Sequence, residues 1–291
     1  MPATTLTNRT FGVEIECYNV TRAALKTALA AEGIASTVAG YDHITRRQWA
    51  LGSDSSISGR RGCEITSPVL SGEDGLAQLA TVLRTVHSMG GLVNRSCGLH
   101  VHIGASDLSL DELKTIAKGW VKFEEAIDTF VPPSRRGNVN GYCRSNKARY
   151  SSEADAYAAI NAAPNVQELA GVVQGGRTYK LNLTPLWRQG TLEIRHHSGS
   201  VEAEKVCNWV RFCLLFVESY REGTPRPWTK ALDLRTQTSR LFGRLGDSEL
   251  AKFYRARQKE LGSVPATARR PRQAPTTTVS TDDLAAANAA I

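Results

Sequence analysis

Apolar and polar residues alternate in three short segments of the chain, and this pattern constrains the fold more than any other feature. The segments read Phe-Gly-Val-Glu-Ile-Glu at 11–16, Gly-Leu-His-Val-His-Ile at 98–103 and Thr-Leu-Glu-Ile-Arg at 191–195. Because residues i and i+2 of an extended strand point to the same face, each segment predicts a strand with one apolar and one polar face. A sheet that contains all three strands would bury the apolar faces and present the polar side chains as one patch.

The expected patch combines carboxylates, imidazoles and a guanidinium, which come from Glu14, Glu16, His100, His102, Glu193 and Arg195. Carboxylates that share a strand face repel each other unless a cation lies between them. Carboxylate oxygens suit Mg²⁺ or Mn²⁺, imidazole is compatible with these ions, and a guanidinium suits a phosphoryl group. The patch therefore predicts a site for divalent cations and phosphate. Each pair alone has a simpler alternative: a solvated strand face for the acids, a structural role for the histidines, and a salt bridge between Glu193 and Arg195.

Two more histidines directly follow Arg195. Strand alternation places His197 on the face of Glu193 and Arg195, and His196 on the opposite face. A hydrolase triad could be drawn with these histidines and a serine, but the chain has no Gly-x-Ser-x-Gly sequence to support it. It also lacks a P-loop and a Gly-x-Gly-x-x-Gly motif, so any ATP site would depend on metal ions and side chains.

Composition predicts a globular, cytoplasmic protein. Apolar residues make up 41% of the 291 residues, no apolar run is long enough for a membrane span, and the polar residues 1–9 predict no secretory signal. The six cysteines include no Cys-x-x-Cys pair, so we expect free thiols. The net charge of +8 is compatible with anionic ligands, with nucleic acid, or simply with good solubility.

Periodicity and capping signals predict the remaining elements. Residues 34–70 should contain strands and turns, and 177–196 a strand pair around Pro185. We expect one folded unit over 1–262 and a disordered tail rich in Pro, Thr, Ala and Arg over 263–291. Helices are expected at 21–32, 73–89, from a capping box at Ser109 onward, 165–173, 201–222 and 247–261.

The part of the chain after the helix that begins at Ser109 is strongly basic. Residues 131–152 contain five arginines or lysines and no acid. We expect a loop at 134–152, either as a solvated surface or as a flap whose Arg135 and Arg136 neutralise phosphates or a substrate carboxylate.

Taken in chain order, the motifs resemble those of the amidoligase family, which is often found in phages. The resemblance covers about residues 10–220. It rests on the three alternating segments together with Asp-x-Ser-Ile at 54–57, Glu-Ile-Thr-Ser-Pro at 64–68, Tyr-Lys-Leu-Asn at 179–182 and the continuation of the last segment to His197 and Gly199. This family belongs to the carboxylate–amine ligase superfamily of glutamine synthetase and glutamate–cysteine ligase.

The resemblance implies an α+β fold with a curved, funnel-like, mainly antiparallel sheet and helices on its outer face. It implies ATP-dependent amide formation through an acyl phosphate, with Mg²⁺ or Mn²⁺. Arg195 would hold phosphate, His102 would lie near the phosphates or the substrate, Asn182 would lie near the site, and the 134–152 loop would shield the acyl phosphate. The implied metal ligands are Glu14, Glu16, Asp54, Glu64, His100 and Glu193.

Two other functions stay open at this point. A metal-dependent hydrolase could use the same acids and histidines to activate water, and the positive charge could serve a nucleic-acid-binding protein. For the ligase, the partners would be a carboxylate and an amine, small molecules or peptides, with a nucleic-acid-linked substrate as a further alternative. We expect no membrane partner. If a phage encodes the chain, the expected location is the host cytoplasm. An oligomer stays open as an alternative, because relatives often assemble.

Overall fold

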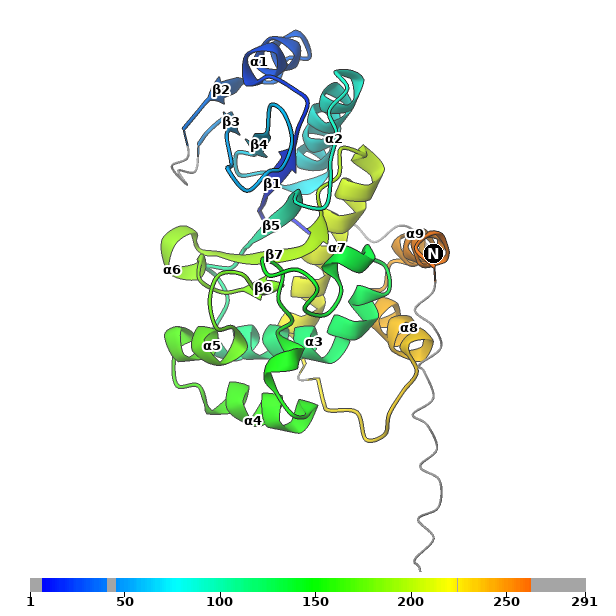
Figure 1. The fold of residues 1–291 in the computed structure, drawn as a ribbon. Helices are drawn as coiled ribbons and strands as arrows, with labels where there is room; N and C mark the ends of the chain where they lie inside the picture. Colours follow the sequence, from blue (N-terminus) through cyan, green and yellow to red (C-terminus); the bar gives the residue numbers. More distant parts are fainter. Residues whose placement is uncertain (1–6, 41–45, 224, 263–291) are drawn as a thin grey trace, which may run out of the picture.

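The computed structural model describes residues 7–40, 46–223 and 225–262. Seven strands form one sheet in the order β2-β3-β4-β1-β5-β7-β6, and every neighbouring pair is antiparallel except β2 and β3. Figure 1 shows this sheet through the middle of the molecule. The strands are β1 (Phe11–Cys17), β2 (Ser36–Val38), β3 (Trp49–Gly52), β4 (Cys63–Thr66), β5 (Gly98–Gly104), β6 (Leu181–Asn182) and β7 (Thr191–Ser198).

Most of the long helices lie along one side of the sheet. Helices α2, α7 and α3 contact one another in that order, and α7 contacts β5. The α-helices are α1 (Arg22–Ala31), α2 (Gly72–Ser88), α3 (Leu110–Asp128), α4 (Glu153–Ala162), α5 (Val166–Val173), α6 (Leu186–Gln189), α7 (Ala203–Arg221), α8 (Leu234–Leu245) and α9 (Ser248–Glu260); two 3₁₀ turns are η1 (Pro133–Arg135) and η2 (Lys147–Arg149).

The alternation in the three strands divides the sheet as expected. The apolar residues of these strands join the inner faces of α2, α3 and α7 in one hydrophobic core. The seven apolar residues that alternate with the polar ones are all almost fully buried: Val13, Ile15, Leu99, Val101, Ile103, Leu192 and Ile194. The predicted α+β class, with a mainly antiparallel sheet and helices on one face, is confirmed.

Most of the expected helices and strands are present, and the capping box at Ser109 forms as predicted. Between β6 and β7, the strand pair encloses the short helix α6. Besides α6, two longer helices were missed. The alanines of α4 are distributed around the helix, so no apolar stripe marks it, and α8 is largely polar. The signal for α8 was Asp233, whose side chain caps the helix by accepting a hydrogen bond from the backbone N–H of Thr236.

The prediction for His197 is wrong because the β5–β7 register shifts within the pair. Leu99 lies opposite His197, whereas Val101 lies opposite Ile194, so β7 has one extra residue at this point. Such an extra residue is typical of a β-bulge, which reverses the alternation beyond it. His197 therefore lies on the helix side of the sheet, with its ring centroid 5.1 Å from that of Trp209.

Three other expectations concern the chain as a whole. All six cysteines are free thiols. Among the described residues, no helix is both long enough and apolar enough to cross a membrane. The expected tail at 263–291 lies outside the described residues, so the proposed boundary at 262 stays a prediction.

Candidate active site

Strand register assembles the polar face from three cross-strand rows. Glu16 of β1 lies opposite Glu64 of β4, and Glu14 of β1 lies opposite His100 of β5. In the third row, His102 of β5 lies opposite Glu193 of β7, and Glu193 lies opposite Asn182 of β6. The rows are adjacent because the residues alternate at i and i+2 on each strand. Residues more than 170 positions apart in the sequence thus share one face of the sheet.

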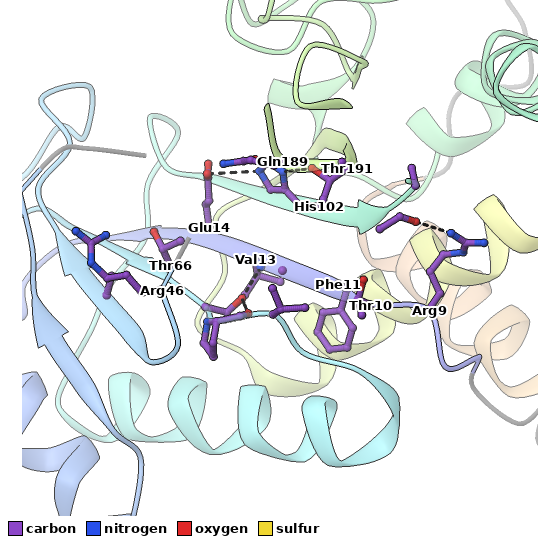
Figure 2. A pocket seen from close by; sticks show the side chains of 18 of the residues that line it. Arg9, Thr10, Phe11, Val13, Glu14, Arg46, Thr66, His102, Gln189 and Thr191 are labelled. Carbon is purple, nitrogen blue, oxygen red and sulfur yellow. Dashed lines mark hydrogen bonds and ion pairs between the residues drawn. The ribbon is translucent and has the colours of Figure 1, made fainter. Parts of the chain in front are cut away.

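Glu14 is at the centre of this face. One carboxylate oxygen lies 3.0 Å from Nδ1 of His100, and the other lies 3.4 Å from Nε2 of His102. The second imidazole also lies 3.1 Å from the hydroxyl of Thr191 through its Nδ1. Figure 2 shows Glu14, His102 and Thr191 in line across the strands. The carboxylate therefore has an imidazole on each of its two oxygens.

The charges of this group stabilise one another. Burial alone would raise the pKa of the Glu14 carboxyl, but the hydrogen bonds from His100 and His102 lower it well below its usual range. Burial alone would lower the pKa of His102, yet Glu14 and Glu193 raise it above its usual value. Opposite charges within a few ångströms favour the ionised forms of both partners. The carboxylates of Glu14 and Glu193 thus favour the protonated form of His102.

Glu16 and Glu64 form a second acidic centre toward the start of β5. An oxygen of Glu16 accepts a hydrogen bond from the backbone N–H of Gly98 at 2.7 Å. Burial and the charges of Glu14, Asp54 and Glu16 raise the pKa of Glu64 to about 8. Asp54 follows β3 in a loop, where its carboxylate accepts the backbone N–H of Ser56 at 2.6 Å. The charges of Asp54 and Glu16 thus oppose the ionisation of Glu64.

Glu193 and Arg195 are paired, and both are fixed by neighbours. Nη1 of Arg195 donates to Glu193 and lies 3.4 Å from Nδ1 of His100. The amide of Asn182 donates to the other oxygen of Glu193 at 2.6 Å, and Gln174 in turn donates to Asn182 at 2.6 Å. The salt bridge that the sequence allowed as an alternative is therefore present, but it forms one part of the larger cluster.

One group of side chains has the spacing that a metal ion needs. Donor atoms of Glu14, His102 and Glu193 all lie within 4.8 Å of one another. Nε of Arg195 is buried without a hydrogen-bond partner, and Nε2 of His102 faces the carboxylate of Glu14 at 3.4 Å. Such an unpaired polar atom is available to a bound ligand. Two carboxylates and an imidazole match the preferences of Mg²⁺ or Mn²⁺.

Arg135 and Arg136 do not reach this cluster. Arg135 is 2% exposed, and its guanidinium donates to the carbonyl of Cys97 just before β5. Arg136 donates through Nε to the carbonyl of Val131. Burial lowers the pKa of Arg136 from its usual value. Both side chains therefore support the backbone around them, and neither lines the cavity beside the polar face.

A cavity of about 580 Å³ opens beside the polar face. Glu14, Glu64 and His102 form polar parts of its wall, and the starts of β1 and β7 and the end of β5 surround it (Figure 2). Ala50 and Val69 add apolar surface, and Val69 is 61% exposed. The volume lies within the range of roughly 300–1,000 Å³ that is usual for small-molecule sites. The cavity thus joins an apolar wall to the charged cluster.

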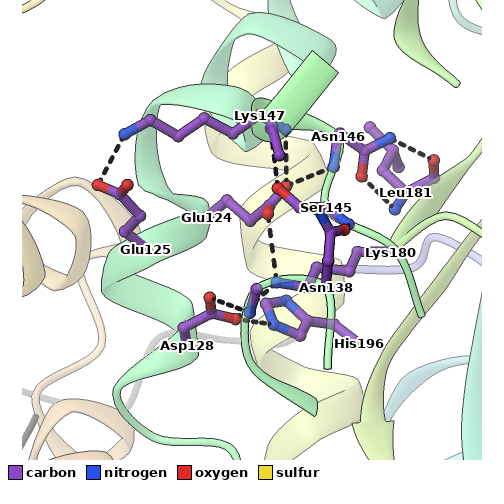
Figure 3. A network of polar contacts seen from close by, with 12 residues as sticks. Glu124, Glu125, Asp128, Asn138, Ser145, Asn146, Lys147, Lys180, Leu181 and His196 are labelled. Atoms are coloured by element: carbon purple, nitrogen blue, oxygen red, sulfur yellow. Dashed lines mark hydrogen bonds and ion pairs between the residues drawn. The ribbon is translucent and has the colours of Figure 1, made fainter. Parts of the chain in front are cut away.

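A buried ionic network behind β7 was missed in the sequence. The ammonium of Lys180 lies 3.2 Å from Glu124 and 2.7 Å from Asp128, and His196 also contacts Asp128 (Figure 3). Arg195 donates its backbone N–H to the carbonyl of Lys180, so the network is attached to the strand that carries the site. Its signal was two acids four residues apart within the apolar stretch of α3, which is unusual unless they are paired.

Comparisons with known proteins place the chain in a family. A search of curated proteins finds no match. Three solved structures that are similar to the chain are described as a novel glutamine synthase homolog, a GmaS/ADP complex and a bifunctional glutathione synthetase from Pasteurella multocida. Their TM-scores are 0.46, 0.45 and 0.39, and their identities are 13%, 12% and 11%. The alignments cover 89%, 87% and 87% of this chain, and 68%, 70% and 47% of the other chains.

The family comparison is more specific. The sequence model described as "Putative amidoligase enzyme" matches residues 7–217. The matched part contains every strand of the sheet and every residue of the polar face. This match assigns a class of chemistry, the formation of a carbon–nitrogen bond by a ligase. The chain is therefore an enzyme and belongs to the amidoligase family.

Proposed function

We propose that this ligase uses ATP and works through an acyl phosphate. A carboxylate oxygen of the acid attacks the γ-phosphorus of ATP, and ADP leaves. The nitrogen of the amine then attacks the acyl carbon, and phosphate leaves as the nitrogen loses a proton and the amide forms. The observation that supports this proposal most directly is the cluster of Glu14, His102 and Glu193, because two of these residues also line the cavity.

The donor set of the polar face fits divalent cations, which would neutralise the phosphate oxygens during transfer. Glu14 and Glu193, with an imidazole, would hold one ion. Glu16, Glu64 and Asp54 would hold another and lose their mutual repulsion by doing so. The family resemblance assigns the imidazole ligand to His100, whereas the distances favour His102. Separate alanine variants of the two histidines decide this point through Mg²⁺ titration.

The cavity is the proposed ATP site. Its apolar wall, which includes Ala50 and Val69, suits a nucleobase, and its polar wall leads to Glu14 and His102. Arg195 lies beyond these residues on the polar face and would stabilise charge on the transferred phosphoryl group. Asn182 would position Glu193 through the hydrogen bond between them. In this arrangement phosphoryl transfer takes place over the central rows of the sheet.

Arg135 and Arg136 would support the backbone near the site, and would not act as a lid over it. Arg135 would position the start of β5 through the carbonyl of Cys97 and thereby support the Gly98 N–H that binds Glu16. Arg136 would stabilise the turn after α3 through Val131. Both residues would act through the backbone, without contact with substrate.

Calorimetric titration of ATP into the purified protein, with and without Mg²⁺, tests the proposal without knowledge of the substrates. We expect binding that requires Mg²⁺ and is lost in Glu193→Gln, with the fold retained in circular dichroism. Glu249→Gln is the matched control, because Glu249 lies exposed on α9 in an ion pair with Lys252. Normal ATP binding in Glu193→Gln would remove this residue from the site. No nucleotide binding by the unaltered protein would contradict an ATP-dependent ligase.

A further inference from the structure

Two loops meet where β1 ends and where β4 and β5 begin. The first is residues 53–62, which precede β4, and the second is residues 93–97, which precede β5. Ser58 donates its backbone N–H to the hydroxyl of Ser96 at 2.8 Å, and the amide of Asn94 donates to the carbonyl of Ser58. The first loop is also held to the end of β1, since Asn19 donates its N–H to the carbonyl of Arg60 at 3.0 Å. The loops therefore form one surface.

This surface carries three exposed arginines, Arg60, Arg61 and Arg95, which we call the arginine rim. Within the described part of the chain, none of the three side chains has a hydrogen bond or an ion pair. Some arginines elsewhere are paired, as in the contacts of Arg9 with Asp107 and Glu218. The rim is thus a concentration of unneutralised positive charge on connected loops.

The rim borders the acidic part of the site. Asp54 belongs to the same loop as Arg60 and Arg61, and its charge raises the pKa of Glu64. Glu16 binds the N–H of Gly98, the residue that directly follows the second loop. The acids nearest to the rim are therefore engaged with backbone groups or with one another, and no ion pair joins them to the three arginines among the described residues.

A carboxylate substrate meets an electrostatic obstacle at such a site. It must approach Glu16 and Asp54, whose negative charges oppose it. Exposed cations beside the approach offset this repulsion and raise the association rate. A guanidinium also binds carboxylates through two parallel hydrogen bonds. The three arginines could therefore hold carboxylates that do not react while another carboxylate enters the site.

We propose that the arginine rim binds the non-reacting carboxylates of an acidic peptide, which would be the acid substrate; this inference rests on the proposed function. A nucleic acid fits the surface less well. Neither loop contains an aromatic residue on which a base could stack. The rim is also short, with its cations confined to two loops, whereas single-stranded nucleic acid is bound along an extended basic groove.

The test measures binding of dye-labelled hexaglutamate by fluorescence anisotropy at about 0.15 M salt, with Mg²⁺ and ADP present. The rim variant replaces Arg60, Arg61 and Arg95 with Gln, which removes the charge and keeps most of the length. The control variant replaces Arg235, Arg255 and Lys259 with Gln. Within the described part of the chain, these exposed residues of α8 and α9 have no side-chain hydrogen bond or ion pair, and the two variants change the net charge equally.

We expect the rim variant to weaken hexaglutamate binding by about tenfold, the ratio that three surface ion pairs together supply. The control variant should bind as the unaltered protein does, and free glutamate should compete poorly. Equal weakening in both variants, equal competition by single glutamate, or no hexaglutamate binding would overturn the proposal. So would a hexathymidylate that competes as strongly as hexaglutamate.

The same samples separate this inference from the proposed function. The rim variant should bind ATP and Mg²⁺ normally, since its arginines do not line the cavity. Loss of hexaglutamate binding with nucleotide binding retained supports the rim as a substrate surface. If the unaltered protein binds hexaglutamate through the rim but binds no ATP, the ligase mechanism fails while the peptide surface stands.

Discussion

Replacement of Lys180 by Met tests whether the buried network behind β7 stabilises the strands of the site. The ammonium is fully buried, 3.2 Å from Glu124 and 2.7 Å from Asp128. Glu124 also accepts the backbone N–H groups of Asn146 and Lys147, at 2.8 and 3.1 Å. The network thereby connects α3, the 134–152 segment and the strand that bears the site (Figure 3).

The expected cost follows from this burial. Removal of one partner from a buried ion pair leaves an uncompensated charge and costs about 3–5 kcal/mol. Here two carboxylates lose their shared cation, so Lys180→Met should fall within this range or above it. A single domain has roughly 5–15 kcal/mol of stability in total. The variant should therefore unfold at a much lower urea concentration, if it folds at all.

Urea unfolding followed by circular dichroism measures this cost. Lys252→Met is the control, because Lys252 forms an ion pair of 2.7 Å with Glu249 on the exposed face of α9. An exposed pair contributes about 0–1 kcal/mol, so this variant should remain close to the unaltered protein. Glu124→Gln added to Lys180→Met should recover part of the loss, because it removes one of the unpaired charges. Equal effects of the two lysine variants would refute the argument that burial sets the cost.

Three further predictions concern the site and its support. Burial and neighbouring carboxylates raise the pKa of Glu64 to about 8, so without metal the free energy of unfolding should fall as pH rises from about 5 to about 8. Glu64→Gln should remove this dependence of the unfolding free energy on pH. Urea unfolding in EDTA between pH 5 and 9 measures it, and an unchanged dependence would assign the effect to other groups. Gly98→Ala should weaken Mg²⁺-dependent nucleotide binding by about tenfold or more, because its Cβ would lie 2.8 Å from Nε2 of His100. Calorimetry measures this loss. The control Gly171→Ala, where the added Cβ has open space around it, should have no effect. Arg135→Met should cost about 1–3 kcal/mol of stability, since it removes a buried hydrogen bond from a charged donor to the carbonyl of Cys97, which keeps only the N–H of Gly199. A loss of turnover without a loss of stability would instead return this residue to a lid.

The sequence alone predicted which residues form the polar face of the sheet. Alternation is a local property, because residues i and i+2 of a strand share a face whatever the strand pairs with. Glu14, Glu16, His100, His102 and Glu193 could therefore be assigned to one face before any pairing was known. The ordered motifs also identified the family. In the same way, the apolar stripes and the capping box at Ser109 predicted the main helices from local pattern alone.

Tertiary structure decided what local patterns cannot contain. The register that brings Glu14 opposite His100 depends on contacts between distant strands, and the extra residue in β7 moved His197 to the helix side. The partners of Lys180 come from a helix more than fifty residues earlier in the chain. Arg135, expected in a flap, is buried because a backbone carbonyl was within reach of its guanidinium. Polarity pattern thus determines which face a strand residue takes, whereas register and long-range packing determine which residues meet there.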